Sequence, residues 1–286
     1  MAPKSKTVTN TWIQSNIHTY GGGLWTTWFD KDLRLGGRVV VKKDNNKLEA
    51  HLYDSVKSIA KIPSLAIHFG TLKGDEFKIN KEANLKPVLS TATYEELNEE
   101  KAENTDSEIE KKHWKALLRD IASKCGEGVD INDIVDFDLC FGDGQEAKLI
   151  GMYDEFISSP RLDNLFSSWF ALQALITKSD KEFVDNCEDI NVVALFDHEE
   201  IGSNSITGAD SNLLPSVLER TFQLLDKSCN SDSMHSCFRR SFLVSADMAH
   251  ATHPNWGSQH QASHNLYLNK GLCLKYNHNQ RYTTNS

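Results

Sequence analysis

The residues from Asn191 to Ser203 constrain the fold of this chain more than any other stretch. They read NVVALFDHEEIGS, so an apolar run typical of a buried strand ends abruptly in three carboxylates and an imidazole. Carboxylates beside a core are neutralised by protonation, by an ion pair or by a metal ion, because an unpaired buried charge is unfavourable. Open α/β sheets place ligand crevices at the carboxyl ends of their strands. The segment therefore predicts a metal site at the end of a strand.

Two further segments place acidic groups in similar positions. Residues 241–246 form a short apolar strand candidate that runs into Asp247 and His250. Asp163 lies just before residues 165–176, whose apolar side chains recur at helical spacing. Three acidic clusters beside apolar segments in one half of the chain favour a shared metal centre.

Each acidic group also has an ordinary structural explanation. Asp163 follows Pro160 and is suited to cap the N-terminus of a helix. Glu199 and Glu200 suit a solvated loop, and Asp247 suits a turn. These explanations are adequate one at a time, whereas the metal centre accounts for all of the groups together.

The chemistry of a paired metal centre explains why these residue types would be used. Two divalent cations about 3.5–4 Å apart need a bridging carboxylate and terminal carboxylate or imidazole ligands to hold a hydroxide at neutral pH. A further carboxylate must stay off the metals as general base. Glu199 and Glu200 suit this division, because neighbouring side chains on extended backbone point to opposite sides. On this hypothesis Asp163 bridges the ions and Asp247 is a terminal ligand.

Several motifs spread along nearly the whole chain carry a resemblance to a known family. They are residues 20–33 (YGGGLWTTWFDKDL), 62–68 (IPSLAIH), 153–156 (YDEF), 160–164 (PRLDN), 199–203 (EEIGS), 245–255 (SADMAHATHPN), 269–271 (NKG) and 275–282 (KYNHNQRY). Through them the sequence resembles the aspartyl aminopeptidases, dizinc peptidases that remove N-terminal Asp or Glu from peptides. Several long motifs in the same order are more specific than any short pattern, so the chain is identified as a member of that family.

The resemblance implies a role for each candidate residue. Asp163 bridges two zinc ions, and Glu200 and Asp247 each ligate one of them. Glu199 is the general base. His68 reaches the active site of a neighbouring subunit and stabilises the reacting carbonyl or its oxyanion; without the resemblance it would be interpreted as a core or strand-end histidine.

The resemblance also implies the partners of the chain. Lys275 matches the family lysine that faces the acidic side chain of the substrate, where an ammonium group is a suitable partner for a carboxylate. Without the resemblance it would be an ordinary exposed lysine. The expected partners are therefore a peptide with N-terminal Asp or Glu and further copies of the chain, which in this family assemble from dimers to dodecamers.

Two histidine motifs of the family have no counterpart in this sequence, one upstream of residues 20–33 and one near the family's C-terminus. We therefore expect a chain that is truncated at both ends, in which each zinc lacks one imidazole and binds more weakly. Four histidines between residues 250 and 264 are an alternative source of ligands, since His260 and His264 have the one-turn spacing of two ligands on a helix. Residues 251–257 read as a loop, which argues against this alternative.

Composition excludes several other classes of function. The net charge of −9 and the lack of a basic patch interleaved with aromatic residues argue against a nucleic-acid partner. The sequence has no apolar run of the length that a signal peptide or a membrane span requires, so a cytoplasmic protein with no membrane partner is expected. Its six cysteines form no close pair of the zinc-finger or redox type, so reduced thiols are expected.

The predicted fold class is α/β. Residues 1–145 alternate β-like segments with polar turns, and residues 146–286 alternate apolar strands with helical patterns, which indicates a parallel-type sheet. The resemblance implies that the first part is a β-rich inserted dimerisation domain. The second part is then an incomplete catalytic domain, a partial zinc-peptidase α/β core.

Individual elements are predicted mainly for the first part. The expected strands are Leu33–Lys42, Leu48–Tyr53, Ser64–Phe69 and Ile134–Phe141, with a hairpin turn at Asp44–Lys47, a solvated charged insertion at Glu95–Glu110 and a helix at Lys111–Lys124.

The leading functional prediction is a metallo-aminopeptidase that removes N-terminal acidic residues from peptides with a zinc-activated water. The alternative is a catalytically impaired assembly or regulatory subunit that docks through residues 1 to about 145 onto complete homologues. A third possibility, a metal hydrolase that acts on another substrate, applies if Lys275 has no part in recognising acidic residues.

Overall fold

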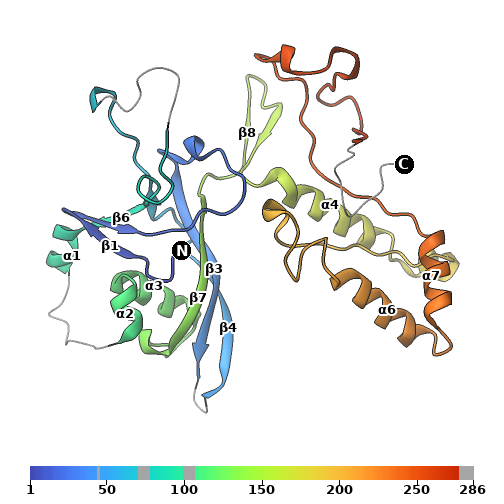
Figure 1. The fold of residues 1–286 in the computed structure, drawn as a ribbon, viewed down its shortest axis with the longest axis horizontal. Coiled ribbons are helices and arrows are strands. Elements are labelled where there is room, and N and C mark those ends of the chain that lie inside the picture. Colours follow the sequence, from blue (N-terminus) through green and yellow to red (C-terminus); the bar gives the residue numbers. More distant parts are fainter. Residues whose placement is uncertain (44–45, 70–77, 99–106, 277–286) are drawn as a thin grey trace. The chain divides into compact units, whose positions relative to one another are not determined.

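The chain folds into two compact units in the computed structural model, Met1–Pro160 and Arg161–Ser286 (Figure 1). The structure describes residues 1–43, 46–69, 78–98 and 107–276. Together the units combine helices with strands, so the chain is a mixed α/β protein. The boundary between the two units, after Pro160, lies a little later in the chain than the boundary predicted after residue 145. The assignment of residues 1–145 to dimerisation and of 146–286 to catalysis stays a prediction.

An antiparallel sheet organises the first unit. Its strands are β1 (Lys6–Thr9), β2 (Trp12–Ser15), β3 (Asp32–Lys42), β4 (Leu48–Asp54), β5 (Ala60–Lys61), β6 (Val88–Thr91) and β7 (Ile134–Asp143). They lie in the order β1-β2-β6-β5-β3-β4, and β7 also pairs with β3. The long strand β3 is therefore the centre of the sheet.

Strand β3 takes this place because its side chains alternate in polarity. Leu33, Leu35, Val39 and Val41 are fully buried, and the residues between them face outward or lie at the margin. Gly37 is required by a close approach of backbone to backbone. A Cβ atom at Gly37 would lie 2.1 Å from the carbonyl oxygen of Asp138 on β7.

One helix covers the core of this sheet. Helix α3 (Lys115–Cys125) buries Leu117, Leu118 and Ile121 against the apolar face of β3, β4 and β7. The other short elements of the unit are η1 (Trp25–Trp28), η3 (Ile67–Phe69), α1 (Ala92–Asn98), α2 (Glu108–Lys112), η4 (Ile131–Asp133) and the hairpin β8 (Lys148–Ile150) with β9 (Phe156–Ser158).

The strands predicted at 33–42, 48–53 and 134–141 are confirmed as β3, β4 and β7. The strand predicted at 64–69 is wrong. Residues 64–69 pair with no neighbouring strand in the described part of the chain, and the backbone instead closes a 3₁₀ turn in which Phe69 N donates to Ala66 O at 3.1 Å.

Other predictions for the first unit are met only in part. The helix predicted at 111–124 is split, because His113 and Trp114 have extended backbone between α2 and α3. The strands around the predicted hairpin turn pair as expected, with Lys42 opposite Leu48, while residues 44–45 of that turn lie outside the described residues. Residues 99–106 of the predicted charged insertion also lie outside them.

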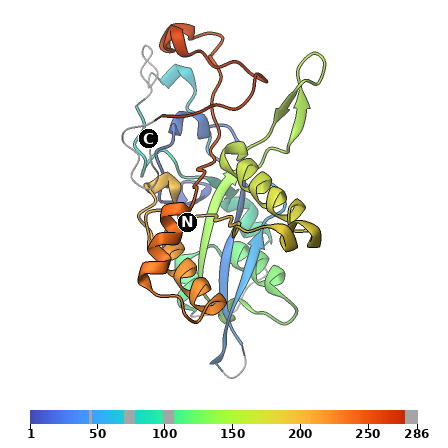
Figure 2. The same cartoon turned by 90° about the vertical axis from the view of Figure 1, so that its right-hand side faces the viewer.

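The second unit is built from helices and irregular segments. The helices are α4 (Leu162–Thr177), α5 (Lys181–Asn186), η5 (Glu199–Ile201), α6 (Leu213–Leu225), α7 (Ser231–Arg240), η6 (Gly257–Gln259) and η7 (Ala262–His264). Helices α6 and α7 are neighbours (Figure 2), and the ring centroids of Phe222 and Phe238 are 6.0 Å apart. The helix predicted at 165–176 is confirmed within α4.

The predicted parallel sheet is not observed. The sheets that the structure describes are antiparallel, and residues 161–276 contain no paired strand. Residues 191–196 and 241–246 are irregular, and most of their larger apolar side chains, such as Leu195 and Phe242, are exposed. Apolar, β-branched sequence favours extended backbone, but a strand also needs a hydrogen-bonding neighbour, which the described part of this unit does not provide.

Among the helices within the described ranges, none combines the length and the hydropathy that crossing a bilayer requires.

Candidate metal centre

Asp163 lies at the entry to helix α4. Arg161 before it has left-handed backbone, with φ at 63°. Asp163 and Asn164 also have non-helical angles, with φ and ψ of −85° and 112° at Asp163 and −123° and 24° at Asn164. The irregular entry places the Asp163 carboxylate before the regular turns of the helix.

Glu199 and Glu200 lie on the single 3₁₀ turn η5. The turn begins after His198, whose backbone is left-handed, and ends at Gly202 with φ at 91°. Ser203 N donates to His198 O at 3.0 Å and closes the turn. Glycine suits the left-handed residue at the end of such a turn. The expectation of extended backbone at Glu199 and Glu200 is therefore wrong, and their different roles cannot rest on strand alternation.

Asp247 follows the irregular segment 241–246. Its Oδ1 accepts from Met248 N at 2.8 Å, and its Oδ2 lies 3.6 Å from Nζ of Lys275. Asn164 Nδ2 donates to Ala246 O at 3.1 Å, which joins this segment to the entry of α4. The structure thus connects the residues next to two of the predicted ligands.

The charges of the other three predicted acidic residues all act on Glu199. The pKa of Glu199 is raised, first by partial burial and then by the negative charges of Glu200, Asp247 and Asp163. The positive charge of Lys275 acts in the opposite direction. Repulsion among gathered carboxylates is the condition that a bound cation relieves.

The donor chemistry of this cluster fits zinc, since carboxylate oxygens are among its usual ligands. These side chains do not form a complete metal site. Within the residues that the structure describes, no group of three or more His, Cys, Asp and Glu side chains is close enough to hold a metal ion. The residues that would hold zinc are Asp163, Glu200 and Asp247. Their carboxylates would have to move closer together to share it.

The whole chain, residues 1–286, matches the family described as Aminopeptidase I zinc metalloprotease (M18). The chain belongs to the M18 family. It is 41% identical to "Aspartyl aminopeptidase 1" of Schizosaccharomyces pombe over 291 residues, which cover 100% of this chain and 60% of the relative. The chain therefore spans less than two thirds of the length of this relative.

Solved M18 structures have the same fold. The chain matches one in "Cryo-EM structure of the Ape4 and Nbr1 complex" with a TM-score of 0.85 and 38% identity, over 94% of this chain and 50% of that one. It matches the S. cerevisiae mApe1 dodecamer with a TM-score of 0.74 and 29% identity, over 92% of this chain and 55% of that one. Members of the M18 family are zinc metallopeptidases, and at least one of them forms a dodecamer.

His68 of this M18 chain lies in the first unit, on η3, and its side chain is exposed. It is therefore neither a core histidine nor a strand-end histidine, which are the two ordinary interpretations. Its action across a subunit interface stays a prediction.

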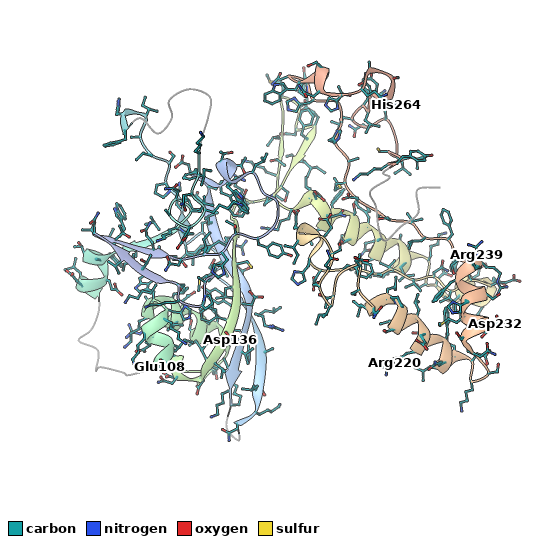
Figure 3. The ribbon with its side chains drawn as sticks, viewed as in Figure 1. Glu108, Asp136, Arg220, Asp232, Arg239 and His264 are labelled. Carbon is teal, nitrogen blue, oxygen red and sulfur yellow. The ribbon has the colours of Figure 1, made fainter. Side chains whose placement is uncertain are left out.

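The local histidines are engaged in loop structure. His260 Nε2 accepts from His253 N at 3.0 Å, and His253 Nδ1 accepts from Asn255 N at 3.1 Å. His260 follows η6 and His264 ends η7 (Figure 3), so the two are not ligands on one helix. The prediction that residues 251–257 form a loop is confirmed up to Gly257, where η6 begins. The lone pair of His260 Nε2 already accepts a hydrogen bond, so it is not available to bind a metal ion.

All six cysteines are free, as predicted. The sequence alone indicates no role for Asn164 in the centre. Its position next to Asp163 and its amide donor are the only sequence signals that could have suggested one.

Proposed function

We propose that this M18 chain is part of a metallo-aminopeptidase that removes N-terminal Asp or Glu from peptides. Glu199 is the general base, and Asp163, Glu200 and Asp247 are the ligands of two zinc ions per complete site. Zinc supplies the electrophilic assistance that lowers the pKa of a bound water and polarises a peptide carbonyl. The observation that carries this proposal is the gathering of four carboxylates in one M18 chain, since the charges of Glu200, Asp247 and Asp163 all act on Glu199.

The chain's own residues suit two tasks in this reaction. Glu199 is the carboxylate that the proposal leaves off the metal, so it is free to take a proton from the attacking water and return it to the departing amine. Lys275 provides a cation at the edge of the cluster and is 63% exposed, which leaves it accessible to an acidic substrate side chain. His68 of a neighbouring subunit stabilises the oxyanion, in an oligomer of two to twelve chains.

The proposal also includes the parallel sheet that the sequence predicts for the second part of the chain. We infer that residues 191–196 and 241–246 are parallel strands of the α/β core in the assembled enzyme. Their apolar sequence and their exposed side chains, such as Leu195 and Phe242, support this role.

A second candidate function is an assembly or regulatory subunit without catalysis. The open ligand geometry among the described carboxylates favours it, and so does the first unit, which has a complete sheet and core of its own. Such a subunit would dock through residues 1 to about 145 onto longer M18 chains.

One experiment separates the two functions. The purified chain is supplied with zinc, and bound zinc and the release of Asp from an aspartyl peptide are measured together with the variant Glu199→Gln. The enzyme predicts bound zinc in both proteins and turnover in the wild type alone. Bound zinc without turnover in the wild type supports the assembly subunit, and an absence of bound zinc contradicts the metal centre.

A further inference from the structure

Asn164 makes a hydrogen bond that joins two distant parts of the second unit. Its Nδ2 donates to Ala246 O at 3.1 Å, across 82 residues of sequence. Both residues that make this bond are next to an acidic residue of the cluster in the sequence. Asp163 directly precedes Asn164, and Asp247 directly follows Ala246. The bond therefore joins the two backbone segments that carry these carboxylates.

The surroundings of Asn164 hold its side chain in place. Ser168 Oγ donates to the backbone oxygen of Asn164 at 2.9 Å and ties it to the first turn of α4. The side-chain oxygen Oδ1 is shielded from solvent and has no hydrogen-bond partner in the part of the chain that the structure describes. A shielded, unpaired amide oxygen is unfavourable, so an asparagine at this position needs a compensating reason.

We propose that Asn164 is a positioning residue that ties the segment carrying Asp163 to the segment carrying Asp247, so that both carboxylates stay available to one metal centre. The inference rests on the proposed function, because it takes both carboxylates as zinc ligands. Asparagine suits the task since its amide donates to a carbonyl and adds no negative charge to the cluster. Aspartate would turn an acceptor toward the Ala246 carbonyl, and alanine would have no donor.

The test compares zinc binding in Asn164→Ala and Asn164→Leu with the wild type. Asn186→Ala is the matched control, because Asn186 Nδ2 also donates to a backbone oxygen, that of Glu182 at 2.7 Å, but within one helix. Zinc affinity is measured by competition with a chromophoric chelator, and the melting temperature is measured without metal.

Loss of the positioning residue should weaken zinc binding by about tenfold, at the low end for groups that orient metal ligands. The metal-free melting temperatures of the Asn164 variants should match that of Asn186→Ala. Unchanged zinc affinity in both Asn164 variants would overturn the inference. A lower zinc affinity that is accompanied by a clearly lower metal-free melting temperature than that of Asn186→Ala would also overturn it, because the variants would then bind less zinc through unfolding.

A second measurement keeps this inference separate from the proposed function. If the wild type binds no zinc, the proposed function fails, and the hydrogen bond is then tested in the metal-free chain by NMR. The side-chain amide protons of Asn164, assigned by their loss in Asn164→Ala, should exchange with solvent more slowly than in the urea-unfolded chain. Equal exchange rates would show that the side chain does not hold the two segments together.

Discussion

His113 should make the stability of the first unit depend on pH. The side chain is only 6% exposed, its Nδ1 shares a hydrogen bond of 2.8 Å with Ser5 Oγ, and its ring packs edge-on against Phe137. Its pKa is lowered from 6.5 to about 4, mainly by burial and then by the positive charges of Lys112 and the N-terminus. Asp136 on β7 (Figure 3) opposes this shift only weakly.

The sign follows from the difference in proton binding between the two states. Between pH 6.5 and pH 4 the unfolded chain binds a proton at His113 that the folded chain does not bind. The stabilisation is therefore present above pH 6.5 and is lost as the pH falls. With these two pKa values, the free energy of unfolding should decrease by about 2 kcal/mol between pH 7.5 and pH 5.

The assay is urea unfolding of the wild type and of His113→Asn at both pH values. Asparagine keeps a polar group near Ser5 but does not titrate, so the difference between the two proteins isolates the contribution of His113. The wild type should lose about 2 kcal/mol more than the variant on going to pH 5. An equal pH dependence in both proteins would refute the argument that burial keeps His113 neutral.

Three further perturbations test other parts of the structure. Lys275→Met removes the ion pair that competes with zinc for Asp247, so zinc affinity should rise by up to about fivefold, since an exposed pair contributes at most ~1 kcal/mol. A lower affinity, measured by competition with a chelator, would contradict this prediction. Gly37→Ala should destabilise the chain by at least ~2 kcal/mol, because its Cβ would meet the Asp138 carbonyl oxygen, and an unchanged melting temperature would show that β3 and β7 are not so closely paired. Leu118→Ala should cost ~2–5 kcal/mol in urea unfolding, because Leu118 is fully buried in the core under α3; a cost below that range would place it outside the core.

The sequence predicts those parts of the fold that depend on local pattern. The alternation in residues 33–42 predicts a strand with one buried face, and the helical spacing in 165–176 predicts a helix. Both elements form as predicted, but only the strand buries its apolar face, because no residue of α4 is buried. Residues 191–196 and 241–246 have equally apolar sequence, but sheet formation depends on neighbours that a local pattern does not contain. The strand predicted at 64–69 fails for the same reason, because no neighbouring strand pairs with it in the described part of the chain.

The candidate site, like the fold, can be predicted only in part from the sequence. Carboxylates that follow apolar segments are visible in the sequence, and the structure brings Asp163 and Asp247 within electrostatic reach of Glu199. The bond from Asn164 to Ala246 and the pair of Lys275 with Asp247 are not visible there, because they join residues that only the folded chain brings together.

The most direct test of the account is the zinc content of the purified chain after dialysis against micromolar zinc, compared with that of the double variant Asp163→Asn and Asp247→Asn. A metal centre built on these carboxylates predicts bound zinc in the wild type and its loss in the double variant. The same zinc content in both proteins, or none in either, would contradict the proposal that the gathered acidic residues of the second unit form a metal centre.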